Sequence, residues 1–178
     1  MTKLTEKQVK WLQKAQNTAM GSKVFVAEFD GLLYAACTDS HRLHAIPVEG
    51  LEPGQYDLFN GELEKLNHTK AAYEKWPQIV PTKSVEEQIV TPEKLGVLKA
   101  KVNAELLEET KLSAICVNER LLIWLDYRLY YDATHYDGQC TMRMLSEKTA
   151  VRFDYDNGAL AVVQPICPKR GSMSNYAT

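Results

Sequence analysis

Four adjacent side chains able to do chemistry follow one another in the segment Thr38-Asp39-Ser40-His41-Arg42-Leu43: a carboxylate, a hydroxyl, an imidazole and a guanidinium. The segment lies between two apolar runs, 32–37 and 43–48, which predict two strands. Polar groups beside buried strands need hydrogen-bond partners. We therefore expect either a structural hydrogen-bond network at a corner of a sheet or the lining of a binding surface. Local chemistry alone favours the structural interpretation.

An enzyme is an alternative for the same residues. Asp39, His41 and His44 could supply metal ligands or acid–base groups, and His135-Tyr136-Asp137 is a second polar cluster. In a strand, however, His41 and His44 point to opposite faces and could not bind one metal ion without a bulge. The sequence contains no nucleophile elbow, phosphate-binding glycine loop or zinc-ligand spacing. We expect a protein that is not an enzyme and uses no metal or cofactor, with metal-dependent hydrolysis by Asp39 and His41 as the weaker alternative.

The overall composition is that of an ordinary soluble protein. The 178 residues are 45% hydrophobic and carry a formal net charge of −2, so DNA binding would require lysines gathered on one face. No apolar run is long enough to cross a bilayer, and we expect a cytoplasmic protein without membrane contact. A reducing compartment without disulfides or zinc is also expected, because the cysteines are widely scattered: Cys37, Cys116, Cys140 and Cys167.

An amphipathic helix is predicted over residues 4–20, with Thr5 at its N-cap and Gly21-Ser22 at its end. Lysines recur along one side of it at three- and four-residue steps: Lys3, Lys7, Lys10 and Lys14. Most such faces are simply solvated. The alternative is a stripe that faces nucleic-acid phosphates.

The remaining pattern predicts two units of similar organisation. In the first unit we expect strands at 23–30, 32–37 and 41–48, a helix at 59–67 and an extended segment at 76–81. In the second we expect a helix from 91, a strand at 112–117, a helix from 118 to 129, and strands at 130–136, 140–145, 150–155 and 159–166. The polar segment 82–88 separates them. We therefore predict an α+β protein with domains 1–83 and 84–178, each with helices on one face of an antiparallel sheet.

One family combines these features. The segment Ala36-Cys37-Thr38-Asp39-Ser40-His41-Arg42-Leu43 resembles the A-T-D-G-H-R-L strand motif of bacterial sliding clamps, the β subunit of DNA polymerase III. Further segments resemble other parts of these clamps in the same order along the chain: 29–33, 58–66, 76–81, 117–125 and 161–166. Their shared order carries the resemblance, because each match alone is weak.

The resemblance implies a fragment equivalent to the last two domains of a three-domain clamp, with the processivity fold. It implies an interdomain pocket for short linear motifs of polymerases and repair proteins, formed by Thr38, Ser40, His41, Arg42, Leu43, Pro81, Val163, Gln164, Pro165 and Ile166. It also implies that helices contact duplex DNA phosphates non-specifically, through Lys7, Lys10, Lys14, Lys94, Lys99 and Lys101.

This sequence departs from the family in several respects. Ser40 replaces the family glycine, which strains a turn or narrows the pocket, and Gln164 replaces an apolar methionine. Both units are shorter than a family domain. A closed ring of two-domain chains would be a homotrimer. A processivity factor that encircles DNA is one outcome, and a diverged or virus-encoded interaction or regulatory module without DNA binding is the other.

Overall fold

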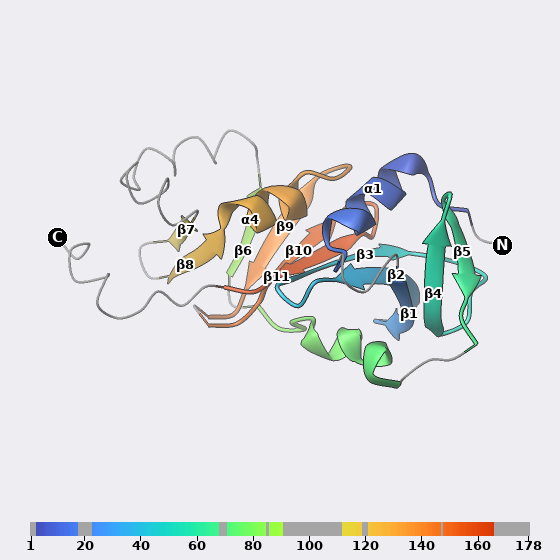
Figure 1. The fold of residues 1–178 in the computed structure, drawn as a ribbon. Coiled ribbons are helices and arrows are strands. Elements are labelled where there is room, and N and C mark those ends of the chain that lie inside the picture. Colours follow the sequence, from blue (N-terminus) through green and yellow to red (C-terminus); the bar gives the residue numbers. More distant parts are fainter. Residues whose placement is uncertain are drawn as a thin grey trace.

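A computed structural model describes residues 3–17, 23–67, 71–84, 86–90, 112–118, 121–146 and 148–165 of the chain. Most of the described strands form one large antiparallel sheet with helices packed on it (Figure 1). None of the helices that it describes is long and apolar enough to cross a membrane.

The first half of the chain forms one end of the sheet. Its elements are α1 (Glu6–Lys14), β1 (Lys23–Phe29), β2 (Leu32–Thr38), β3 (Arg42–Pro47), β4 (Gly54–Phe59), β5 (Glu62–Lys65) and the 3-10 helix η2 (Ala71–Ile79). The predicted N-cap of α1 is confirmed: Thr5 accepts a hydrogen bond from the backbone of Gln8, and the Gln8 side chain accepts one from the backbone of Thr5.

The second half forms the other end. Its elements are β6 (Glu86–Val90), β7 (Leu112–Asn118), β8 (Leu121–Asp126), α4 (Tyr127–Thr134), β9 (Cys140–Met144), β10 (Val151–Tyr155) and β11 (Leu160–Val163). Strands β7 and β8 form a separate hairpin. The helix expected from residue 91 lies outside the described residues.

The two halves meet through strand pairing. The sheet has nine strands in the order β5-β4-β1-β2-β3-β11-β10-β9-β6, and β3 pairs with β11 with Leu43 opposite Val162. A single ladder of backbone hydrogen bonds therefore continues from one half into the other. The end of this β3–β11 junction is where the polar segment 38–43 lies.

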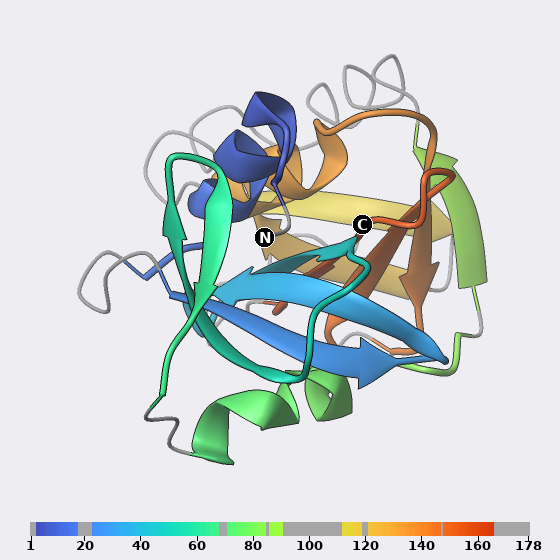
Figure 2. The same ribbon diagram turned by 90° about the vertical axis from the view of Figure 1, so that its right-hand side faces the viewer.

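Each face of the sheet has its own core. Helices α1 and α4 cover one face, and η2 covers the other (Figure 2). Alternation along β3 divides its side chains, so that Ile46 belongs to the core under α1 and α4, while Leu43 and Ala45 belong to the core under η2. The predicted α+β class, with helices on an antiparallel sheet, is confirmed.

The helix predicted at 59–67 is wrong, because this segment forms the β4–β5 hairpin. Asn60 and Gly61 make its turn with φ angles of +52° and +84°. Asn-Gly is the strongest short-range hairpin signal, and it outweighs the helical spacing of Leu58, Leu63 and Leu66 in the sequence.

Two predictions in the second half are wrong, because a predicted helix forms a strand and a predicted strand forms a helix. Residues 121–126 of the helix predicted from 118 to 129 form β8, whereas residues 130–134 of the strand predicted at 130–136 belong to α4. Strand β8 pairs with β7, and Asp126 caps α4 by accepting a hydrogen bond from the Arg128 backbone at 2.8 Å. The capping residue therefore marks the change from strand to helix.

The extended conformation predicted at 76–81 is also wrong over most of its length, because η2 continues to Ile79 with Pro77 inside it. Trp76 is buried, and its ring lies 6.2 Å from that of Phe29 and 6.3 Å from that of Tyr34. Packing against the sheet holds this short helix. The expected domain boundary at 83/84 falls between η2 and β6 and stays a prediction.

Candidate peptide-binding site

The polar segment forms a tight, hydrogen-bonded connection between β2 and β3. The carboxylate of Asp39 accepts hydrogen bonds from the backbone N–H groups of His41 and Arg42, both at 3.0 Å. Thr38 Oγ1 donates to the carbonyl of Arg42 at 2.7 Å and accepts from the N–H of Ser40 at 3.2 Å. The structural network expected from local chemistry is therefore present.

Ser40 has the strained backbone that its replacement of glycine predicts. Its φ is +79°, in the left-handed region that favours glycine because a Cβ atom clashes there. The turn has this conformation although serine is unfavourable there. Two hydrogen bonds stabilise it: the N–H of Ser40 donates to Thr38 Oγ1, and the N–H of His41 donates to Asp39 Oδ1.

The same turn forms one wall of a shallow depression at the β3–β11 junction. The depression has about 180 Å³ of unfilled space, part of it open to solvent. Its lining comes from the turn, from β3, from the end of η2 and from β11, and consists of Thr38, Ser40, His41, Arg42, Leu43, Ile79, Val162 and Gln164. Six of these residues belong to the set predicted from the sequence, so the structure brings both halves of that set together.

Two lining residues were not predicted. Val162 lines the depression, whereas the predicted Val163 is fully buried in the core under α1 and α4. Successive residues of a strand point to opposite faces, and the pairing of Val162 with Leu43 puts these two on the same face. Ile79 comes from η2 and is 46% exposed.

The other predicted residues lie at or beyond the margin. Pro81 is partly buried, and its carbonyl accepts a hydrogen bond from Arg152 at 3.2 Å. Pro165 is also partly buried, one residue beyond Gln164. Ile166 lies outside the described residues.

The guanidinium of Arg42 binds acids rather than facing solvent. Its Nε donates to Asp39 at 3.1 Å, and its Nη1 donates to Asp132 of α4 at 2.5 Å. Asp132 also forms an ion pair with Lys14 at 3.1 Å. Burial alone would raise the pKa of Asp132, but hydrogen bonds from Lys14 and Arg42 outweigh it and hold that pKa below its ordinary value.

His44 lies inside the protein and not in the depression. It is fully buried, its Nδ1 donates to the carbonyl of Trp11 at 2.8 Å, and its ring stacks on Trp11 at 4.4 Å. Burial lowers its pKa to about 4. The described residues include no group of three side chains arranged to hold a metal ion. Asp39 accepts from two backbone N–H groups and from Arg42 Nε, and His44 Nδ1 donates to a backbone carbonyl.

Three lysines of the predicted stripe are paired with acidic side chains. Every one of its described members expected to bind DNA forms an ion pair: Lys7 with Asp137, Lys10 with Glu6 and Lys14 with Asp132. The pairs of Lys7 and Lys10 are exposed, and that of Lys14 is half-buried. Lys94, Lys99 and Lys101 lie outside the described residues.

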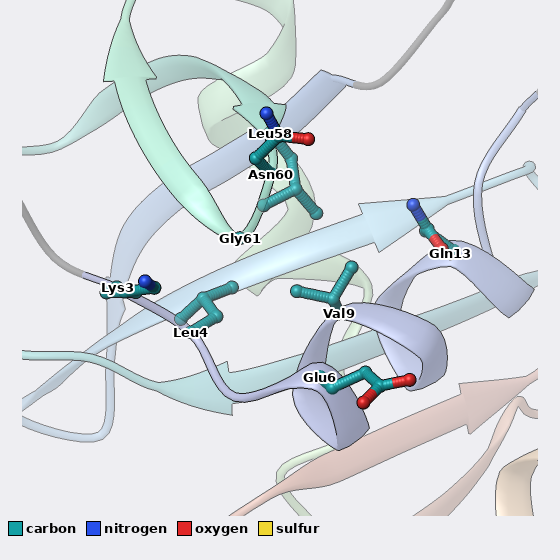
Figure 3. Close-up of a pocket in the computed structure, with 8 residues that line it drawn as sticks. All are labelled: Lys3, Leu4, Glu6, Val9, Gln13, Leu58, Asn60 and Gly61. Carbon is teal, nitrogen blue, oxygen red and sulfur yellow. The ribbon is translucent and has the colours of Figure 1, made fainter.

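A larger hollow lies elsewhere, between α1 and the β4–β5 turn (Figure 3). It has about 780 Å³ of unfilled space, including open solvent, with apolar side chains of Leu4, Val9 and Leu58 and a polar rim. The hydrogen bond from Leu4 N to Gly61 O, at 2.8 Å, closes one side. None of the described residues predicted to bind a peptide lines this hollow, and Lys3 is its one member from the predicted lysine stripe.

Comparison with solved structures identifies the fold. The DNA polymerase III beta subunit of Thermotoga maritima matches with a TM-score of 0.62 at 12% identity, over 92% of this chain and 63% of that one. The chain has the fold of a bacterial sliding clamp.

Other clamps match in the same way. The polymerase sliding clamp of Caulobacter crescentus has a TM-score of 0.60 at 12% identity, over 90% of this chain and 62% of its own. The Helicobacter pylori beta clamp bound to a DNA ligase peptide has a TM-score of 0.59 at 8% identity, with the same coverages. The chain thus spans less than two thirds of the length of these clamps. No protein-family model and no curated protein matches the sequence.

Proposed function

We propose that this protein is a non-enzymatic, replication-associated interaction hub that binds short linear peptide motifs in the depression at the β3–β11 junction. One observation carries the proposal: residues of the clamp-like strand motif, of η2 and of β11 converge on this depression from both halves of the chain. The Helicobacter pylori clamp of the same fold is described as bound to a DNA ligase peptide.

The depression suits a peptide that places an apolar side chain on its floor and its polar main chain at the rim. Leu43 and Val162 form a floor that is almost completely buried, and Ile79 offers an exposed apolar edge. The hydroxyl of Ser40 and the amide of Gln164 lie at the rim and can bind the main chain of a peptide. A few polar groups around an apolar floor are typical of such sites.

The test is fluorescence polarisation with a labelled peptide that carries a bacterial clamp-binding motif. Ile79→Ser and His41→Ala should each weaken binding at least fivefold, because both residues line the depression and Ile79 is exposed. The matched control is Ile89→Ser in β6, which is 48% exposed and does not line the depression. Equal loss in the control, or no binding by the folded wild-type protein, would reject the proposal.

DNA binding is the second part of the proposal. Helices α1 and α4 lie on one face of the sheet, and the exposed ion pairs of Lys7 and Lys10 are weak enough for phosphates to replace their acidic partners. We propose that these two lysines contact duplex phosphates, with Lys94, Lys99 and Lys101 as further contacts, whereas Lys14 is held by Asp132.

This part is tested by the salt dependence of duplex binding. Removal of one lysine–phosphate interaction should reduce the slope of log affinity against log salt by about 0.9, so Lys7→Glu with Lys10→Glu should reduce it by about 2. Lys65→Glu, on the edge strand β5, is the control. A slope that the double variant leaves unchanged would exclude Lys7 and Lys10 as phosphate contacts.

Light scattering tests whether the chain forms the homotrimer that a ring requires.

A further inference from the structure

One arginine, Arg42, links the turn that forms a wall of the depression to helix α4 on the opposite face of the sheet. Arg42 Nε binds Asp39, which lies in the turn, and Arg42 Nη1 binds Asp132, which lies in α4 of the other half. The two carboxylates are separated by 93 positions in the sequence. One guanidinium therefore joins the turn to a helix of the second half.

The geometry of the turn depends on Asp39. Its Oδ1 accepts the N–H groups of His41 and Arg42, and its Oδ2 accepts Arg42 Nε. The carbonyl of His41 then accepts the N–H of Gln164 at 2.9 Å, and both residues line the depression. Rotation of Asp39 would release the two N–H groups and shift this wall.

The network is shielded enough to be rigid. The side chain of Arg42 is only 14% exposed, and those of Asp39 and Asp132 are each 23% exposed. Hydrogen bonds between charged groups are stronger than neutral ones, and shielding from water strengthens them further. Asp132 is fixed in turn by Lys14 and by the helix that carries it.

We propose that Asp132 is a positioning residue for the peptide site: it holds Arg42, and through Arg42 and Asp39 it sets the turn that forms one wall of the depression. Asp132 does not line the depression and would not touch the peptide. This inference rests on the proposed function of the depression, and it assigns control of that site to the second half of the chain.

Asp132→Asn is the test, and Asp137→Asn is its matched control. Asp137 also joins the second half to α1, through an exposed ion pair with Lys7 at 2.8 Å, whereas the ion pairs of Arg42 among the described residues are with Asp39 and Asp132. Two quantities are measured on the folded full chain: the exchange rates of the His41 and Arg42 amide protons by NMR without peptide, and the affinity for the labelled clamp-motif peptide.

Asp132→Asn should raise both exchange rates and weaken the peptide about tenfold, the effect of losing one charged hydrogen bond. Asp137→Asn should change neither quantity more than about twofold, as expected for an exposed pair. In an Arg42→Met background, Asp132→Asn should have no further effect on affinity, because Asp132 acts only through Arg42. A merely structural role would give additive losses.

A second variant covers the case in which Asp132→Asn does not fold. Arg42→Lys keeps the charge, but a single ammonium cannot bind both carboxylates as the guanidinium does. Faster exchange of the same two amide protons and weaker peptide binding are therefore expected. Unchanged exchange and affinity, equal effects of Asp137→Asn, or additive losses would overturn the proposal. If the wild-type protein binds no peptide, the proposed function fails, while the exchange rates still decide whether Asp132 sets the turn.

Discussion

Acid should destabilise this protein through His44. His44 is fully buried against Trp11, and its Nε2 has no hydrogen-bond partner in the described structure. Burial is the main cause that lowers its pKa to about 4 from 6.5. Arg42 and Lys14 lower the pKa further, whereas the Trp11 carbonyl and Asp132 oppose the shift.

The sign and size follow from proton linkage. Between pH 6.5 and about 4 the unfolded chain binds a proton at His44 and the folded protein does not, so the free energy of unfolding falls as the pH is lowered through this window. At about 1.4 kcal/mol per pKa unit, the loss amounts to about 3 kcal/mol. The contribution is fully present above pH 6.5.

The assay is urea unfolding at pH 7, 6, 5 and 4, followed by far-UV circular dichroism. His44→Gln is the comparison, because glutamine does not titrate and its amide can still donate to the Trp11 carbonyl. The difference in unfolding free energy between wild type and variant should shrink by about 3 kcal/mol from pH 7 to pH 4. The pKa of Asp132 in the wild-type protein is lowered from 3.8. Parallel pH profiles would refute the argument that His44 is buried in its neutral form.

Two further predictions concern backbone strain. Ser40→Gly should raise the free energy of unfolding by up to about 1 kcal/mol, because glycine adopts the φ of +79° without a Cβ clash; no gain in the urea midpoint would contradict the strain. Gly138→Ala should cost at least about 2 kcal/mol, because its φ is +91° and an added Cβ would lie 2.0 Å from Asp156 Oδ1. Gly50→Ala is the control, with a φ of +68° and nothing within 4 Å, and an equal loss there would show that strain alone, and not the contact with Asp156, sets the cost.

Turn and cap residues made several elements predictable. Asp30-Gly31 and Asn157-Gly158 connect pairs of neighbouring strands, and Thr5 begins α1. These signals depend on the backbone conformations and hydrogen bonds of a few neighbouring residues, so they can be recognised in the sequence. Two errors arose where helical spacing was preferred over such a signal, at Asn60-Gly61 and at Asp126. The error at 76–81 was of the opposite kind, because η2 continues through Pro77.

The strand motif itself located the candidate site. The order of acid, hydroxyl, imidazole and guanidinium between two apolar runs indicated either a hydrogen-bond network or a binding surface. The network is present, and Thr38, Ser40, His41, Arg42 and Leu43 also line the depression proposed as the binding site. Val162 could have been found from the sequence as well, because strand alternation places it on the same face as Leu160 and opposite to Val163.

By itself, the sequence determined several local features of this protein: the strands β1, β2 and β3, the cap at Thr5, the strained turn at Ser40 and the residues that carry its chemistry. Only the tertiary structure decided which partners those residues have. It pairs β3 with β11, brings Ile79 to the depression, and places Asp132 against Arg42. These contacts join residues far apart along the chain, and no local propensity encodes them, because they depend on how the two halves of the sheet pack and pair.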